Sequence, residues 1–145
     1  MRMSLVAGLL LCAACQPNLF FQAYPGPRLP PEQHARIVTI PSSNGLIRPV
    51  VNCVDNQWEP APEVYVLPGR HYLTVLYLVG SYWSEGALWL DAEAGHTYNV
   101  LWEAQGGGVR FWLVDAATGR PVGGIVGGEP NPGPREKICI PRRGR

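Results

Sequence analysis

The sequence predicts an all-β fold, a single antiparallel β-sandwich of about seven to eight short strands. Short apolar stretches alternate with turn residues at intervals of roughly 8 to 12 residues, the spacing typical of sandwiches and barrels. Hydrophobic residues make up 46% of the chain and include five Trp and six Tyr, which is enough to build a core. No stretch keeps a helical period, so helices are not expected to contribute to that core.

The first expected strands are 35–40, which is rich in β-branched residues, and the apolar stretch 46–54. Between them lies the turn sequence 41–45, which ends in Asn-Gly. Because Asn-Gly readily takes the positive φ angles of tight turns, we expect these two strands to form a hairpin. A third short strand is expected at 63–67, beyond a polar break.

The longest expected strand is 71–79, after a Pro-Gly turn. Alternate residues in a strand point to opposite faces of the sheet, and here both sets are largely apolar. Two apolar faces are typical of a central strand that is covered on both sides. Residues 80–86 are expected to form a polar and aromatic loop.

The remaining expected strands are separated by turns rich in Gly. They are 87–93, 97–104, 109–115 and 120–126. Residues 35–126 are therefore predicted to form one sandwich domain. Residues 127–145 are rich in Gly, Pro and Arg, and we expect a mobile tail there unless Cys139 holds it.

Residues 1–14 have the order of a secretory signal, with a positive start at Arg2, an apolar run and small residues before Cys15. The run is far shorter than the about 20 apolar residues that a transmembrane helix needs. The segment resembles the lipobox of bacterial lipoproteins, although Cys12 stands where these signals usually carry Leu. An ordinary secretory signal that happens to contain cysteines is the alternative.

The lipobox resemblance implies that 1–14 is a signal peptide and that Cys15 becomes the lipidated first residue of the mature chain. Two or more acyl chains hold a protein stably on a membrane. The resemblance also implies a site on the outer membrane facing the periplasm, because Gln16 replaces the Asp of inner-membrane retention signals. The membrane lipid would thus be the first partner of this chain.

Residues 15–34 are expected to form a proline-rich linker between the lipid and the sandwich, because proline favours extended structure. Phe20, Phe21 and Tyr24 are unusual in a linker and could dock on the domain.

Cys53 and Cys139 remain after Cys12 and Cys15 are assigned to the signal and the lipid. An even pair of cysteines in an oxidising compartment predicts a disulfide. By closing so long a loop, it would stabilise the fold by about 4 to 5 kcal/mol. Two unpaired thiols are the alternative. Neither cysteine has a second Cys or His at ligand spacing, so no metal site is expected.

Charge and motifs exclude several functions. Removal of Arg2 with the signal peptide leaves 11 of the 12 basic residues, which balance the 11 acidic ones. The mature chain is then neutral, so no nucleic-acid partner is expected. The chain has no nucleophile elbow, phosphate loop or zinc-binding helix motif. His34, His71 and His96 could converge on a metal, but backbone-bonded histidines at strand ends are the simpler interpretation. We therefore expect no enzyme and no cofactor.

Binding is the better-supported class of function. Trp58, Tyr82 and Trp83 are large aromatic residues in expected loops, where they would suit contact with an envelope protein or a glycan. The alternative is that they close the open ends of the sandwich. Paired carboxylates at Asp91 and Glu93 are interpreted as a solvated strand face.

Four short motifs resemble those of a group of small bacterial envelope lipoproteins: 24–30, 67–71, 92–98 and 115–119. Val54-Asp55 followed by 67–71 is also similar to the PEGA type of β-sandwich repeat, although Asn56 stands where those repeats carry Gly. The resemblance implies an immunoglobulin-like or PEGA-like sandwich without an assigned activity.

The sequence thus predicts a non-catalytic, lipid-anchored envelope protein with a binding or structural module. A periplasmic enzyme or metal-binding protein with an unrecognised site is the alternative.

Overall fold

The computed structural model describes residues 19–140. The predicted signal peptide 1–14 and the predicted lipidation site Cys15 lie outside the described residues. The strands are β1 (Phe21–Gln22), β2 (Ala35–Thr39), β3 (Val50–Val54), β4 (Glu63–Val66), β5 (Gly69–Val79), β6 (Tyr82–Ala92), β7 (Thr97–Gln105), β8 (Gly108–Asp115), β9 (Pro121–Val122) and β10 (Gly124–Ile125). Two short 3₁₀ turns, η1 (Pro31–Gln33) and η2 (Arg135–Lys137), complete the described elements.

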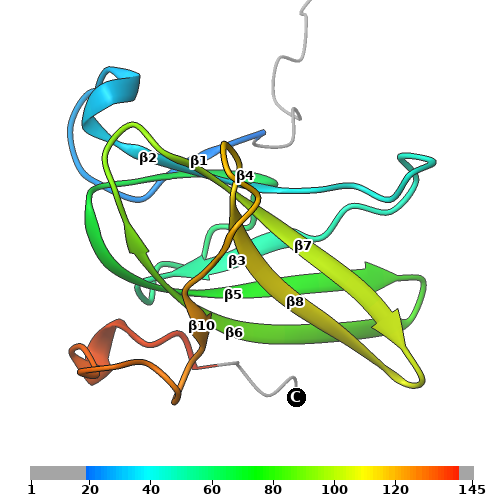
Figure 1. Cartoon of the computed structure of the whole chain (residues 1–145). Helices are drawn as coiled ribbons and strands as arrows, with labels where there is room; N and C mark the ends of the chain where they lie inside the picture. The colour runs from blue at the N-terminus through cyan, green and yellow to red at the C-terminus, as the bar shows by residue number, and fades with distance from the viewer. Residues whose placement is uncertain (1–18, 141–145) are drawn as a thin grey trace, which may run out of the picture.

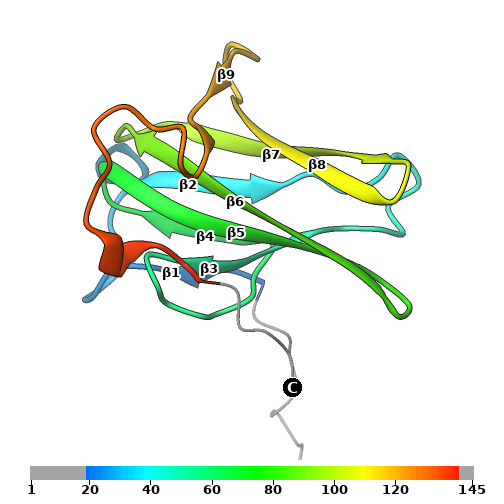
Figure 2. The ribbon, with the colours of Figure 1, turned by 90° about the horizontal axis from the view of Figure 1, so that it is seen from below.

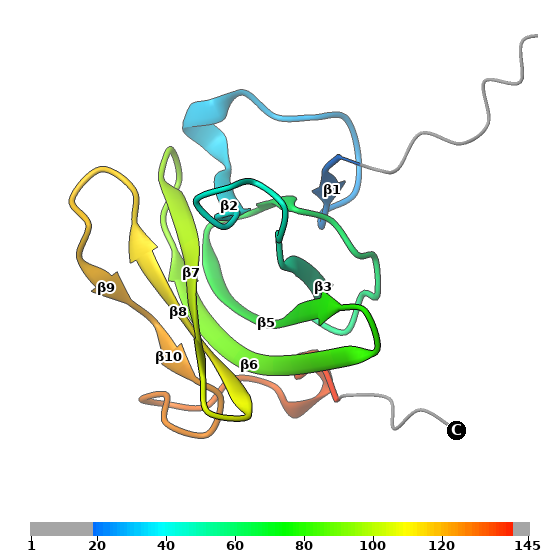
Figure 3. The same ribbon diagram turned by 90° about the vertical axis from the view of Figure 1, so that its right-hand side faces the viewer.

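The predicted sandwich is confirmed: two sheets pack face to face (Figure 1). Sheet A has the strand order β1-β4-β2-β7-β8-β9, and sheet B has the order β10-β6-β5-β3. Seen end-on, both sheets curl around the same core (Figure 3). No helix within residues 19–140 has the length and apolar character needed to cross a membrane.

Alternate residues of the strands fill the space between the sheets. Ile37 of β2 and Val100 of β7 come from sheet A, and Leu73 and Val75 of β5 come from sheet B; all four are inaccessible to solvent or nearly so. Because side chains alternate along a strand, the same strands turn their other residues outward. Burying each such side chain stabilises the fold by about 1.5 to 3 kcal/mol.

The β5–β6 hairpin is longer than the sequence predicts. Each strand has 11 residues, and Val79 pairs directly with Tyr82 across a two-residue connection. Residues 82–86, expected in a loop, therefore belong to β6. Gly86, which favours a loop in the sequence, instead leaves room for Phe111, whose ring would lie 2.5 Å from a Cβ at that position.

The prediction of a central strand at 71–79 is confirmed, but the strand is covered on both sides only over residues 71–75, and Leu78 and Val79 are exposed. β5 lies between β6 and β3, and its outward residues Tyr72 and Thr74 are fully buried. Residues 126–140, here called the strap, run across this outer face of sheet B (Figure 2). The Gly133 amide donates a hydrogen bond to the Tyr72 hydroxyl at 2.7 Å.

The predicted disulfide between Cys53 and Cys139 is present and attaches the end of the strap to β3. Their Cα atoms are 6.1 Å apart, although 86 residues separate them in sequence. The expected mobile tail is therefore a packed segment as far as the described residues extend. Residues 141–145 lie beyond them.

The predicted hairpin at 41–45 is wrong. Its local turn forms, since the Gly45 amide donates to the Ser42 carbonyl and the Leu46 amide donates to the Asn44 side chain. However, β2 belongs to sheet A and β3 to sheet B, so the segment 40–49 crosses between the sheets. A turn signal specifies local backbone geometry but not which strands pair.

The expected last strand, 120–126, is split between the two sheets. β9 pairs with β8 in sheet A, and β10 pairs with β6 in sheet B. Gly123 makes the change of direction with a φ of +62°, and a Cβ there would lie 2.0 Å from the Trp89 carbonyl oxygen. Only glycine fits a backbone with this conformation and this close approach.

The proline-rich segment does not behave as a free linker from residue 19 onward. β1 adds to sheet A in parallel with β4, and Phe21 and Ala23 pack against the core. Tyr24 is buried. The aromatic residues thus anchor the described part of 15–34 on the domain, because the apolar area they bury outweighs the extended preference of the prolines.

Candidate functional site

A groove of about 690 Å³ lies on the outer face of sheet A. We call it the arginine groove. Its floor is the outward set of residues from β2, β4 and β7, and its wall is the segment 28–34 that precedes β2. The lining residues are Arg28, Leu29, Pro30, Pro31, His34, Arg36, Glu63, Tyr65, Gly95, His96 and Thr97.

The proline-rich segment forms a rigid wall. The Leu29 amide donates to the Tyr24 hydroxyl at 3.2 Å, and Pro30 stands at the N-cap of the η1 turn. His34 Nδ1 lies 3.0 Å from the Pro30 carbonyl oxygen. Because a carbonyl oxygen only accepts, Nδ1 donates this hydrogen bond, and Nε2 is the ring nitrogen left for other contacts.

Glu63 organises the floor of the arginine groove. It accepts two hydrogen bonds from the Arg36 guanidinium, at 2.6 and 2.9 Å, and a third from the Tyr65 hydroxyl. The Arg36 bonds hold the pKa of Glu63 below its usual value. Burial first, and then the nearby Glu63 carboxylate, raise the pKa of Tyr65. The carboxylate is thus ionised and largely committed to its neighbours.

Arg28 differs from Arg36 because its partners are neutral. Its guanidinium lies over the Tyr65 ring, 4.2 Å from the centroid, and near the Phe20 ring at 5.3 Å. It also donates to the Tyr65 hydroxyl. Among the described residues it forms no ion pair. Stacking holds the cation in place. Its charge also lowers the pKa of Glu63 slightly, but that carboxylate is paired with Arg36, so two arginines face one carboxylate and one positive charge is left in excess.

His96 stands at the edge of the arginine groove and is held by two carboxylates. Nδ1 lies 2.7 Å from Asp115 Oδ2, and Nε2 lies 3.3 Å from Glu93 Oε2. The hydrogen bond with Asp115 raises the pKa of His96, and the same bond lowers the pKa of Asp115. Asp115 also accepts from the Ala117 and Thr118 amides, so the pair closes the turn after β8.

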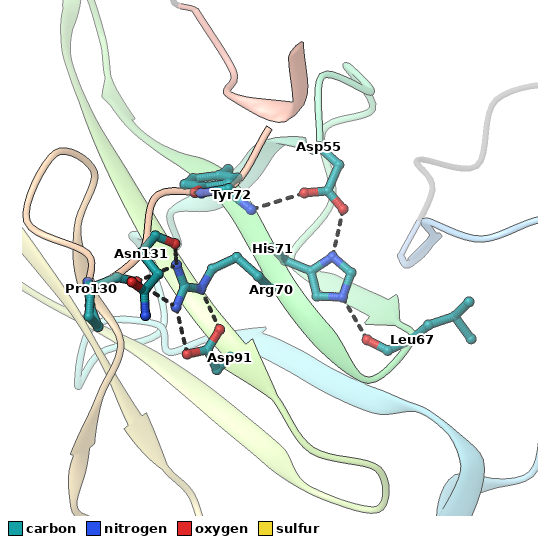
Figure 4. Close-up of polar contacts among 9 residues, drawn as sticks. Asp55, Leu67, Arg70, His71, Tyr72, Asp91, Pro130 and Asn131 are labelled. Carbon is teal, nitrogen blue, oxygen red and sulfur yellow. Dashed lines mark hydrogen bonds and ion pairs between the residues drawn. The ribbon is translucent and has the colours of Figure 1, made fainter. Parts of the chain in front are cut away.

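A second polar cluster joins three segments near the start of β5 (Figure 4). His71 Nδ1 lies 2.6 Å from Asp55 Oδ2, and Nε2 lies 2.6 Å from the Leu67 carbonyl oxygen. His71 Nε2 donates to the Leu67 carbonyl oxygen, because a carbonyl only accepts. The other Asp55 oxygen accepts from the Tyr72 amide at 3.0 Å. Both ring nitrogens of His71 and both oxygens of Asp55 thus have partners within the domain.

Arg70 extends this cluster to the strap. Its guanidinium lies 4.6 Å from the centroid of the Trp89 ring and pairs with both oxygens of Asp91. It also donates at 3.3 Å to the carbonyl oxygens of Pro130 and Asn131 (Figure 4). The Asp91 hydrogen bond raises the pKa of Arg70 above its ordinary value. The role of Arg70 is structural, because it fastens the strap to β5 and β6.

The structure separates the three predicted partner-binding residues. Tyr82 and Trp83 begin β6, near the tip of the β5–β6 hairpin. Trp58 lies in the segment that runs back along the outer edge of β3, as the bridge between Val51 and Ala61 shows. β5 and β3 therefore lie between Trp58 and the other two, and no single surface uses all three.

The three histidines do not converge. His34 and His96 both line the arginine groove, while His71 lies in the separate cluster with Asp55. Among residues 19–140, no group of three or more His, Cys, Asp or Glu side chains could hold a metal ion. Asp91 pairs with Arg70, and Glu93 faces His96, so the two carboxylates do not act together.

Sequence reasoning missed Arg28, Arg36, Glu63 and Tyr65. One signal was available: Arg36 and Glu63 are the only charged residues of their predicted strands. Their pairing depends on β2 lying beside β4, which the sequence does not specify.

No protein-family model, curated protein or solved structure matches this chain.

Replacing Asp55 with Asn should destabilise the fold by about 2 kcal/mol, because it removes the carboxylate from a mostly buried hydrogen bond with His71. Asn still accepts from the Tyr72 amide and tolerates the φ of +48° at this position. Urea unfolding measures the loss. The matched control is Asp91→Asn, whose carboxylate is more than half exposed and should cost less than about 1 kcal/mol. Equal losses would refute the assigned role of Asp55.

The His96–Asp115 pair should make stability depend on pH. Its contribution is complete where both groups are charged in the unfolded chain, between their ordinary pKa values of 3.8 and 6.5. It is lost as pH rises through the raised pKa of His96, and as pH falls through the lowered pKa of Asp115. The unfolding free energies of the native chain and of His96→Gln should therefore differ most near pH 5 and converge at alkaline pH. A difference that is constant from pH 5 to 9 would contradict this.

Proposed function

We propose that the chain is a non-catalytic, lipid-anchored binding protein of the bacterial cell envelope, and that the arginine groove is its binding site. Acylated Cys15 would hold it on a membrane. The outer membrane is favoured, with the domain facing the periplasm. The signal-like order of residues 1–14 supports this location, and so does the Cys53–Cys139 disulfide, since disulfides persist in oxidising compartments.

The observation that carries the binding proposal is the position of Arg28. A guanidinium that is stacked on an aromatic ring and hydrogen-bonded by a neutral hydroxyl is held in place before any ligand arrives. Less conformational freedom is then lost on binding. Guanidinium groups pair well with the planar oxygens of carboxylate and phosphate groups. The proposed ligand is therefore an acidic group carried by an envelope protein or glycan.

The other groups of the arginine groove suit the body of such a ligand. Arg36 is 44% exposed and keeps part of its guanidinium toward solvent, although Glu63 neutralises its charge. His34 supplies a ring nitrogen, and the prolines of the wall supply apolar contact. Donors, a ring nitrogen and an apolar wall around one excess positive charge fit a polar molecule with a single anionic group.

Photo-crosslinking in intact cells tests this proposal. A photoreactive amino acid at Thr97, which lines the arginine groove, should capture a partner, whereas the same residue at Thr118 should not. Arg28→Gln should weaken capture about ten- to a hundredfold, because hydrogen bonds to charged groups contribute about 1.5 to 3 kcal/mol. Arg120→Gln, an exposed arginine outside the groove, is the matched control. Equal capture by the native chain and Arg28→Gln would contradict the proposal.

A further inference from the structure

Three loops lie at one end of the sandwich (Figure 1). Their tips contain no Asp, Glu, Lys or Arg. The three loops are the crossing segment 40–47, the tip of the β5–β6 hairpin and the tip of the β7–β8 hairpin. The two hairpin tips share one cavity, lined by Tyr77 and Tyr82 on one side and 104–109 on the other. The Trp102 indole donates to the Ile40 carbonyl at 2.8 Å, which places the third loop beside them. We call this surface the three-loop end.

The three-loop end concentrates the exposed apolar surface of the molecule. Ten large hydrophobic residues are exposed among the described residues, and half of them lie here: Leu46, Leu78, Val79, Tyr82 and Trp83. Leu46 is 83% exposed and Trp83 is 62% exposed. No Asp, Glu, Lys or Arg occurs from residue 71 to residue 84. The opposite end, with the arginine groove and the Asp55 cluster, holds charged groups instead.

The direction of β1 brings the lipid anchor toward this same end. β2 runs toward the crossing segment 40–47, β4 is antiparallel to β2, and β1 is parallel to β4. The chain therefore enters β1 from the side of the three-loop end. Phe21 pairs with Val64, and Ile37 pairs with both Val64 and Tyr98. Phe21 of β1 therefore lies at the same height in sheet A as Tyr98 of β7. Seven residues, or about 23 Å, separate Tyr98 from the β7–β8 tip.

The length of chain between Cys15 and Phe21 is slightly shorter than that distance. Six residues extend at most about 20 Å. Cys15 can therefore approach the level of the β7–β8 tip but cannot pass it. An anchor of this length holds the domain close to the bilayer, where the three-loop end is the apolar surface within reach.

We propose that the three-loop end inserts into the lipid interface of the membrane that holds Cys15. This inference rests on the anchor in the proposed function. Trp and Tyr prefer the boundary between headgroups and acyl chains, and Leu and Val insert below it. Because the tips are uncharged, insertion depends on apolar contact rather than on anionic lipid. The orientation leaves the arginine groove at the far end, open to the periplasm.

Spin labels on the acylated full-length chain test the proposal. One label replaces Ser81 at the β5–β6 tip (Ser81→Cys), and the control replaces Thr118 in the turn after β8 (Thr118→Cys). The protein is reconstituted in phosphatidylcholine vesicles, and separately in phosphatidylethanolamine and phosphatidylglycerol at 3:1. The Ser81 label should be relaxed more by oxygen than by a water-soluble nickel chelate in both lipids, and the Thr118 label should show the reverse. Adding Leu46→Ser and Trp83→Ser should move the Ser81 label back into water.

A Cys15→Ser chain separates this proposal from the anchor. It should reach the same Ser81 depth but need at least tenfold more lipid. An acylated chain that stays on the vesicles with its Ser81 label in water would overturn insertion while leaving the anchor intact. A native chain that keeps Cys15, is not acylated in cells and still buries the Ser81 label would overturn the anchor alone. A Ser81 label shielded without lipid, together with a dimer in solution, would assign the three-loop end to a second copy and also overturn the proposal.

Discussion

The Cys53–Cys139 disulfide is the constraint on which the arrangement of sheet B depends. It fixes the end of the strap to β3, so the strap must cross the outer face of β5. That face carries Tyr72 and Thr74, which are buried only because the strap covers them. In the chain-entropy account, closing a loop of this length stabilises the fold by about 4 to 5 kcal/mol, comparable to the whole stability of many small domains. Sheet B thereby obtains a second covered face around Tyr72 and Thr74.

Ion pairs also hold the turns and the strap of this domain in place. In the pairs His71–Asp55 and His96–Asp115, an aspartate in a turn holds a histidine at or near the start of a neighbouring strand. Arg70 fastens the strap in a similar way. Through these pairs, residues 54–55 meet 67–71, and 92–98 meet 115–119. Turn geometry explains why these segments lie together.

Sequence alone predicted the layers better than the connections. The period of two in β5 identified its two covered faces, and an even pair of cysteines predicted the disulfide. The errors share a cause, because each involved a partner distant in sequence. Asn44-Gly45 forms its turn, but the next strand pairs with β5 rather than with β2. Gly86 favours a loop until Phe111 is seen beside it. The candidate site was missed for the same reason, since Arg28 and Tyr65 meet only after β1 and β4 pair.

The two ends of the sandwich differ in the chemistry of their exposed side chains. One carries polar groups that are mostly paired, with one arginine charge in excess, and the other carries uncharged aromatic loops. This division requires a rigid frame between them, which we attribute to the disulfide-fixed strap. Hydrogen exchange at the Gly133 amide, which bonds to Tyr72, tests that attribution in a Cys53→Ser, Cys139→Ser double variant. We predict that exchange there accelerates at least about a hundredfold while amides of β7 in sheet A change far less. An unchanged rate at Gly133 would contradict the account.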